Sequence, residues 1–96
     1  MLFRSALKII GLCEAAGIQM VIGTDTESRL GVLPRLHVRA AIPSFDPWPS
    51  EVGFFQQLAD DIYDGRLEVK DGCVSVPKGA GFGGVIDEKK LKKYRA

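Results

Sequence analysis

The sequence has few of the residues that build metal and redox sites. Its 96 residues include a single histidine, His37, and two cysteines, Cys13 and Cys73, which lie far apart and form no CxxC pair. One histidine and two distant thiols cannot complete a zinc ligand set. We expect both cysteines to be small buried hydrophobes in a reducing compartment, and His37 to be an ordinary helix-surface or packing histidine.

An excess of charge of one sign and a long apolar run are also absent. Thirteen basic and twelve acidic residues give a formal net charge of +1, which provides no field to attract nucleic acid or an anionic membrane. The apolar N-terminal stretch is interrupted by Arg4 and Lys8, is too short to span a membrane, and is not followed by a signal-peptide cleavage pattern. We therefore expect a cytoplasmic protein without nucleic-acid or membrane partners. The basic run over residues 89–95 is interpreted as a solvated last helical turn.

Hydrophobic periodicity predicts one α-to-β step in the first half of the chain. Apolar residues at helical spacing over residues 2–16, with Gly17 as a left-handed cap, predict a helix. The almost continuous apolar run over residues 18–24 predicts a strand buried on both faces, as in a parallel sheet. A second helix is expected over about residues 31–41, with Pro34 in its first turn.

Turn-forming residues dominate the second half. Three prolines within residues 43–49 exclude regular structure there, because proline removes backbone donors and restricts its neighbours. Ser50 is expected to open a short helix that ends near residues 62–63. A terminal helix is expected over residues 87–94, with Asp87 as its cap.

The clearest local signal is a β-hairpin. Strands over residues 67–70 and 73–76 flank an Asp-Gly dipeptide, which supplies the positive φ angles of a two-residue turn. The register pairs Val69 with Val74 and gives the hairpin one apolar and one polar face.

Residues 79–84, Gly-Ala-Gly-Phe-Gly-Gly, match the letters of a GxGxxG dinucleotide fingerprint. We reject this interpretation because no βαβ unit and no acidic residue about twenty positions downstream accompany it. We expect these glycines to let the backbone turn sharply and pass close to another segment.

The predicted strand over residues 18–24 has no partner of its own kind. So apolar a strand needs neighbours on both edges and cover on both faces, whereas the hairpin strands alternate in polarity and suit a surface. We infer an α/β fold in which this chain was cut from, or evolved as part of, a larger sheet.

Two carboxylates follow this strand. In barrel and open α/β enzymes the reactive side chains lie just beyond the C-terminal ends of strands, which is where Asp25 and Glu27 stand. A carboxylate there can hydrogen-bond a substrate or transfer a proton. The alternative is that Glu27 or Asp25 only caps the next helix.

At this point a family resemblance is evident. The run GIQMVIGTDTESRLGVLPRLHVRAAIP, residues 17–43, resembles the eighth strand and eighth helix of the mandelate racemase and muconate-lactonizing branch of the enolase superfamily, with its G-T-x-x-E-S-x-L/I-G pattern. The tail from Leu58 to Tyr94 is similar to that family's C-terminal segment, with its D-D-I motif, V-x-D-G-x-V-x-V-P hairpin and V-D-E before a last helix.

The chain departs from the family pattern at several positions. Residues 80–83 stand where P-G-L-G is usual, and Pro34 stands where a small helix former is usual. Asp46 matches the first acidic residue of a pair found in the dipeptide epimerases, but the second falls on Trp48, which argues against that specificity.

The resemblance implies a C-terminal fragment of a (β/α) TIM-type barrel. The seventh helix, eighth strand and eighth helix would be followed by a helix, a hairpin and a terminal helix, with residues 1–45 in the barrel and residues 46–96 forming a C-terminal segment. It also implies a Mg²⁺-dependent enzyme that removes a proton next to a carboxylate and stabilises the enolate on the metal. The family's bases and metal ligands lie on earlier strands, so only Glu27 is carried over as catalytic, with Asp25 as a substrate-binding residue.

Two hypotheses follow. The first is a fragment of such an enzyme, acting in full length on a small carboxylate or acid sugar as a dehydratase, cycloisomerase, racemase or epimerase, with a weak preference for dehydratases. Alone it would bind no Mg²⁺ and be inactive. The second is a stand-alone α+β interaction module that forms a homo-oligomer through its apolar strand.

Overall fold

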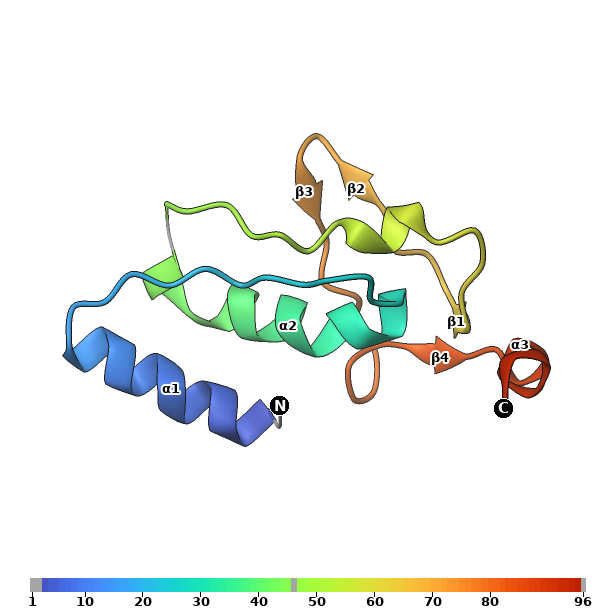
Figure 1. Ribbon diagram of the computed structural model, residues 1–96, viewed down its shortest axis with the longest axis horizontal. Helices are drawn as coiled ribbons and strands as arrows, with labels where there is room; N and C mark the ends of the chain where they lie inside the picture. Colours follow the sequence, from blue (N-terminus) through green and yellow to red (C-terminus); the bar gives the residue numbers. More distant parts are fainter. Residues whose placement is uncertain (1–2, 46, 96) are drawn as a thin grey trace.

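The computed structural model describes residues 3–45 and 47–95. The elements along the chain are the helices and strands α1 (Phe3–Ala15), α2 (Arg29–Ala41), η1 (Pro43–Phe45), η2 (Phe54–Gln57), β1 (Tyr63–Asp64), β2 (Val69–Lys70), β3 (Cys73–Val74), β4 (Val85–Ile86) and α3 (Glu88–Tyr94), where η marks a 3-10 helix. Figure 1 shows that the chain doubles back after α1 and runs in an extended segment beside α2. In this view the hairpin β2–β3 lies above the extended segment, the pair β1–β4 lies to the right of α2, and α3 is at the right-hand end of the molecule.

Helix α1 confirms the first predicted helix. Gly17 takes the left-handed conformation with φ +67°, and the amide of Ile18 closes the cap on the carbonyl oxygen of Cys13 at 2.9 Å. Only Ile10 is buried among the described residues of α1. Much of its apolar surface therefore faces solvent.

The prediction of a doubly buried strand over residues 18–24 is wrong for this structure. The segment is extended, but within the described residues it forms only an isolated parallel bridge, between Gly23 and Glu51. Ile18 is 58% exposed and Val21 61% exposed. The segment is exposed because the described residues provide no second apolar strand to pair with it, a deficit already evident in the sequence.

Helix α2 begins two residues earlier than predicted. Ser28 is its N-cap, and the Ser28 hydroxyl oxygen accepts a hydrogen bond from the Gly31 amide at 3.2 Å. Pro34 lies inside the helix and not in its first turn, which corrects the prediction. Proline at this position removes the donor that would reach the carbonyl of Leu30. Burial of Val32, Leu33 and Leu36 compensates, since these are among the least exposed residues of the chain.

The helix predicted from Ser50 to residues 62–63 is also wrong in extent. Only the 3-10 turn η2 forms, and Leu58 after it is extended. A longer helix would draw Asp61 away from the start of α2, where its carboxylate is bound. The prolines before it allow one more short 3-10 turn, η1, in a stretch predicted to be irregular.

The β-hairpin confirms the sequence prediction in detail. Val69 pairs with Val74 and Lys70 with Cys73, and Asp71 and Gly72 both have positive φ, of 51° and 73°. Val69, Val74 and Val76 pack on the core. Cys73 points to the polar face and is exposed, which corrects the prediction that both cysteines are buried; Cys13 is half-buried.

The pair β1–β4 was not predicted. Tyr63 pairs with Ile86 and Asp64 with Val85, over a sequence separation that no local pattern reveals. The glycine-rich stretch over residues 79–84 turns sharply and passes close to other segments, as predicted. Gly83 has φ +73° and lies close to Pro77, and a side chain at Gly84 would collide with Leu33.

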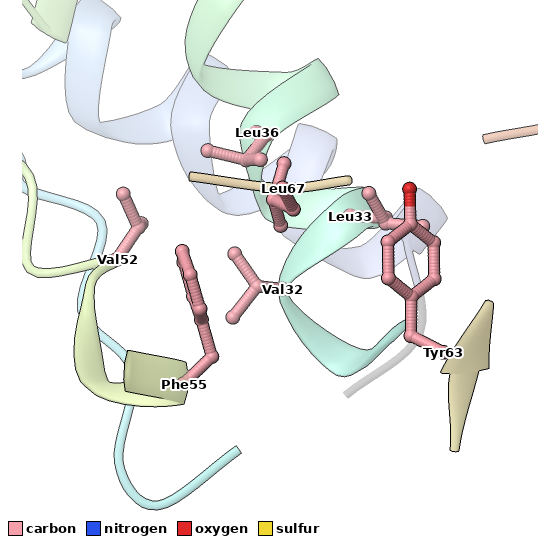
Figure 2. Close-up of a cluster of buried hydrophobic side chains, with 7 residues drawn as sticks. All are labelled: Val32, Leu33, Leu36, Val52, Phe55, Tyr63 and Leu67. Carbon is pink, nitrogen blue, oxygen red and sulfur yellow. The ribbon is translucent and has the colours of Figure 1, made fainter. Parts of the chain in front are cut away.

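One core holds α2 against the second half of the chain. Figure 2 shows its buried side chains, which are Val32, Leu33, Leu36, Val52, Phe55, Tyr63 and Leu67. A smaller cluster of Ile10, Val38 and Phe45 attaches α1 to the other side of α2. No helix in the described ranges has the length and hydrophobicity needed to cross a bilayer.

Candidate functional site

The loop over residues 24–27 leaves the extended segment and is attached to the second half of the chain. The Thr24 hydroxyl donates to the carbonyl oxygen of Glu51 at 2.6 Å, and the amide of Glu51 donates to the carbonyl oxygen of Ile22 at 2.9 Å. The amide of Glu27 donates to the carbonyl oxygen of Asp25 at 2.7 Å, which tightens the loop. The loop therefore presents its side chains from a backbone fixed at both sides.

Glu27 turns back over the first turns of α2. Its Oε1 forms an ion pair with Nη2 of Arg35 at 2.5 Å. Its Oε2 is buried and has no hydrogen-bond partner among the described residues. A buried acceptor without a donor costs about 1–3 kcal/mol, so this carboxylate has one satisfied oxygen and one that favours the arrival of a donor.

Asp25, the predicted substrate-binding residue, is exposed. Its side chain makes no hydrogen bond within the described part of the chain, and its main chain supports Glu27. The alternative that Asp25 or Glu27 caps α2 is not what the structure shows, because Ser28 takes that position. Neither the Asp25 nor the Glu27 carboxylate is used as the N-cap of α2.

The cap of α2 is completed by a residue that the sequence interpretation did not single out as functional. Asp61 is 7% exposed and accepts hydrogen bonds from the Arg29 amide at 2.7 Å and the Tyr63 amide at 3.2 Å. The Arg29 guanidinium lies 3.4 Å from the same carboxylate and 5.0 Å from the centre of the Phe55 ring. Asp61 thus stabilises the start of the helix that follows the candidate loop.

Its neighbour Asp60 anchors the last helix. Lys90 Nζ lies 2.6 Å from Asp60 Oδ1, and the Tyr94 hydroxyl donates to Oδ2 at 2.7 Å. The hydrogen bond from Lys90, followed by that from Tyr94, holds the pKa of Asp60 well below its ordinary value. Asp60 and Asp61 form the D-D pair of the resemblance, and here both have structural partners.

The residues present do not fit a Mg²⁺ site by themselves. Mg²⁺ is held in proteins by carboxylates together with waters and substrate oxygens, and one Glu27 oxygen is already engaged by a guanidinium. Within the described ranges no three acidic, histidine or cysteine residues gather in a way that could hold a metal. No step of the chemistry below is assigned to a metal on this chain.

His37 lies apart from this loop. Its Nε2 is 3.1 Å from the carbonyl oxygen of Phe82, and its ring is 5.5 Å from the Phe82 ring. This agrees with the expectation of a packing residue, since His37 attaches the glycine-rich turn to α2.

Known proteins with the same pattern are enzymes of one superfamily. The sequence profile described as Enolase C-terminal domain-like matches residues 3–90. The chloromuconate cycloisomerase of Pseudomonas putida is 36% identical over 90 residues, which cover 94% of this chain and 24% of that enzyme. The N-succinylamino acid racemase of Thermus thermophilus is 35% identical over 79 residues, or 81% of this chain and 21% of that protein.

Solved structures agree. The muconate lactonizing enzyme of Klebsiella pneumoniae superposes with a TM-score of 0.87 and 34% identity over 96% of this chain and 25% of that one. The chain spans about a quarter of the length of the relatives it matches. These similarities confirm the resemblance seen in the sequence. The chain belongs to the enolase C-terminal domain-like family and corresponds to a portion of its TIM-type barrel.

Proposed function

We propose that this chain is part of a cycloisomerase of this family. In that enzyme Glu27 would be a catalytic residue whose carboxylate contacts the substrate. The observation that carries the proposal is the place of Glu27. It lies in the G-T-x-x-E-S pattern, directly after the segment that resembles the eighth barrel strand, with one oxygen held by Arg35 and the other without a partner among the described residues.

The proposed reaction is an isomerisation. A cycloisomerase acting on an unsaturated dicarboxylate such as muconate joins a carboxylate oxygen to an alkene carbon of the same molecule, and the neighbouring carbon gains a proton. In this scheme Glu27 contacts the substrate through a proton shared between its carboxyl group and a substrate carboxylate, or assists the proton transfer to carbon. Asp25, exposed on the same loop, is proposed to bind a substrate carboxyl group, a contact that requires a proton shared between the two groups.

The similar enzymes reported above change the type of reaction that we propose. The sequence alone weakly favoured acid-sugar dehydratases, whereas the relatives reported above are cycloisomerases and a racemase. We therefore propose cycloisomerisation of a small carboxylate in place of dehydration.

Several features of the whole enzyme remain proposals. They are a Mg²⁺ cofactor held by residues other than those described, a homo-oligomeric state, a cytoplasmic location, and a division between a barrel part over residues 1–45 and a C-terminal segment over 46–96. A stand-alone interaction module, the competing hypothesis, would need none of the chemistry assigned to Glu27.

A hybrid enzyme tests the proposal. Residues 3–90 of this chain would replace the matched quarter of the Klebsiella pneumoniae muconate lactonizing enzyme, with which they superpose at a TM-score of 0.87. We expect the hybrid to consume muconate, followed by the loss of its ultraviolet absorbance. Glu27→Gln should lower kcat/KM by about a hundredfold or more, because a group that contacts the reacting molecule typically contributes that much.

Glu68→Gln provides the matched control, since Glu68 is also paired with an arginine but lies exposed on the hairpin. This variant should keep the activity of the parent hybrid. A folded hybrid that consumes no muconate, or one that is indifferent to Glu27→Gln, would refute the proposal. The 96-residue chain alone should be inactive with Mg²⁺ present, and calorimetry should detect no tight Mg²⁺ binding to it.

A further inference from the structure

Arg35 is the described residue that holds the Glu27 side chain, and nothing in the family resemblance assigned it a role. We propose that Arg35 is a positioning residue for Glu27: it fixes one carboxylate oxygen and leaves the other to contact the ligand. This inference rests on the proposed function, because it concerns how Glu27 is held for that reaction.

The Arg35 guanidinium is fixed by two contacts. Its Nη1 donates to the carbonyl oxygen of Gly31 at 2.9 Å, and its Nη2 lies 2.5 Å from Glu27 Oε1. A planar guanidinium held at two nitrogens has a defined plane as well as a defined position. Arg35 stands on α2 next to Leu36, which is 4% exposed and packed in the core. The guanidinium that holds Glu27 therefore belongs to the helix that contributes Val32, Leu33 and Leu36 to the core.

Glu27 is constrained from its backbone as well. Its amide is bonded to the Asp25 carbonyl, and its side chain lies over Gly31, where an added side chain would meet the Glu27 Cβ at 3.6 Å. Oε2 is buried, so water does not reach it, and it has no partner among the described residues. Because Oε1 is paired with Arg35, Oε2 is the oxygen that remains to contact the ligand, through a proton shared with a substrate carboxylate.

An ordinary surface ion pair is the competing explanation. The side chains of Arg35 and Glu27 are 39% and 29% exposed, and pairs of this kind contribute little to stability. The chain contains a matched example in Arg66 and Glu68, 2.9 Å apart with side chains 84% and 59% exposed. A purely structural Arg35 would behave like Arg66, whereas a positioning residue would act through Glu27.

The first test examines the pairing in the 96-residue chain by NMR of the arginine side chains. A guanidinium held at two nitrogens rotates slowly about its Nε–Cζ bond, so we expect separate Nη signals for Arg35. Glu27→Gln should merge them into one averaged signal, while Glu68→Gln leaves Arg35 unchanged. Arg35 signals that are averaged already in the parent chain, or that do not respond to Glu27→Gln, overturn the inference.

The second test is a double-mutant cycle on muconate consumption by the hybrid enzyme. Arg35→Met should lower kcat at least about tenfold, because a small misplacement of a catalytic group is costly, and Arg35→Lys should restore part of the loss. Combined with Glu27→Gln, Arg35→Met should add no further loss, since Arg35 acts only through Glu27. Arg66→Met is the control and should match the parent.

The outcomes separate this inference from the proposed function. Additive losses in the cycle, or Arg35→Met within twofold of the parent, overturn the positioning role while the activity of the parent upholds the proposed function. A parent hybrid without activity refutes the proposed function and the positioning role with it, and the NMR signals of Arg35 then report a pairing that serves the fold alone.

Discussion

The carboxylates of Glu27 and Asp61 differ in how many of their hydrogen-bonding positions are occupied. Glu27 has one oxygen paired and one buried without a donor among the described residues, while Asp61 is buried and accepts hydrogen bonds from two backbone amides and one guanidinium. The first arrangement leaves capacity for a ligand. The second is satisfied and stabilises the start of α2, where the partial positive charge of the helix favours an anion.

Asp61→Ala should therefore destabilise the protein. Removal of this carboxylate leaves the Arg29 and Tyr63 amides without their acceptor, and we expect a loss of about 2 kcal/mol in the free energy of unfolding. Urea denaturation at pH 7 measures it. Asp64→Ala, an exposed change in the same stretch, should cost less than about 0.5 kcal/mol. Equal effects of the two substitutions would show that Asp61 is not a cap.

Glu27 was singled out by its place after an apolar run and by the resemblance, and its catalytic role stays a prediction. Asp61 binds a residue 32 positions earlier in the chain, and no sequence pattern reports that distance. The pairing of Arg35 with Glu27 also escaped prediction, because helical periodicity alone does not show that its guanidinium reaches back to a loop.

Elements whose causes are local formed as predicted. The Asp-Gly turn requires two positive φ angles and obtains them at Asp71 and Gly72, and Asp87 caps α3 by accepting from the amides of Lys89 and Lys90. The extended segment over residues 18–24 and the helix predicted from Ser50 failed, because their conformation depends on what packs against them.

Helix α3 has no buried residue, and beyond the β1–β4 pair and the hydrogen bond from the Asp87 amide to Ile62 it is held by the polar contacts of Asp60. The pKa of Asp60 lies below its ordinary value of 3.8 because of hydrogen bonds from Lys90 and then Tyr94. A depressed carboxylate pKa means that the anchoring is fully present above the ordinary value and is lost as the pH falls towards the lower folded-state value.

Asp60→Asn should therefore free α3 at neutral pH. We expect faster amide exchange and lower order parameters for residues 90–94 in the variant at pH 6, where the wild-type helix stays docked. The difference between variant and wild type should shrink as the pH drops below about 4. Glu88→Gln, which changes a carboxylate at the start of the same helix, should have little effect. Wild-type α3 that loosens between pH 7 and pH 5 would contradict the assignment to Asp60.

The whole molecule is less compact than a self-contained domain of its size, and it exposes large apolar side chains. Its radius of gyration is 14.5 Å, against about 12.5 Å expected for a compact chain of this length. Leu12 is 72% exposed, and Ile18 and Val21 more than half. An apolar cavity of about 230 Å³ lies between α1, the extended segment and α2, with Ile10, Met20, Ile22 and Val38 among its lining residues. This face suits the contacts that neighbouring barrel units would make.

We propose that residues 18–24 become a barrel strand, and position Glu27 at its end, only when further barrel units cover them. Within the described residues, the amides of Gln19 to Ile22 donate no backbone hydrogen bond. The most direct test is hydrogen exchange of these amides in the 96-residue chain and in the hybrid enzyme. We expect rapid exchange in the isolated chain and strong protection in the hybrid; strong protection in the isolated chain, shown by sedimentation to be a monomer, would contradict the claim.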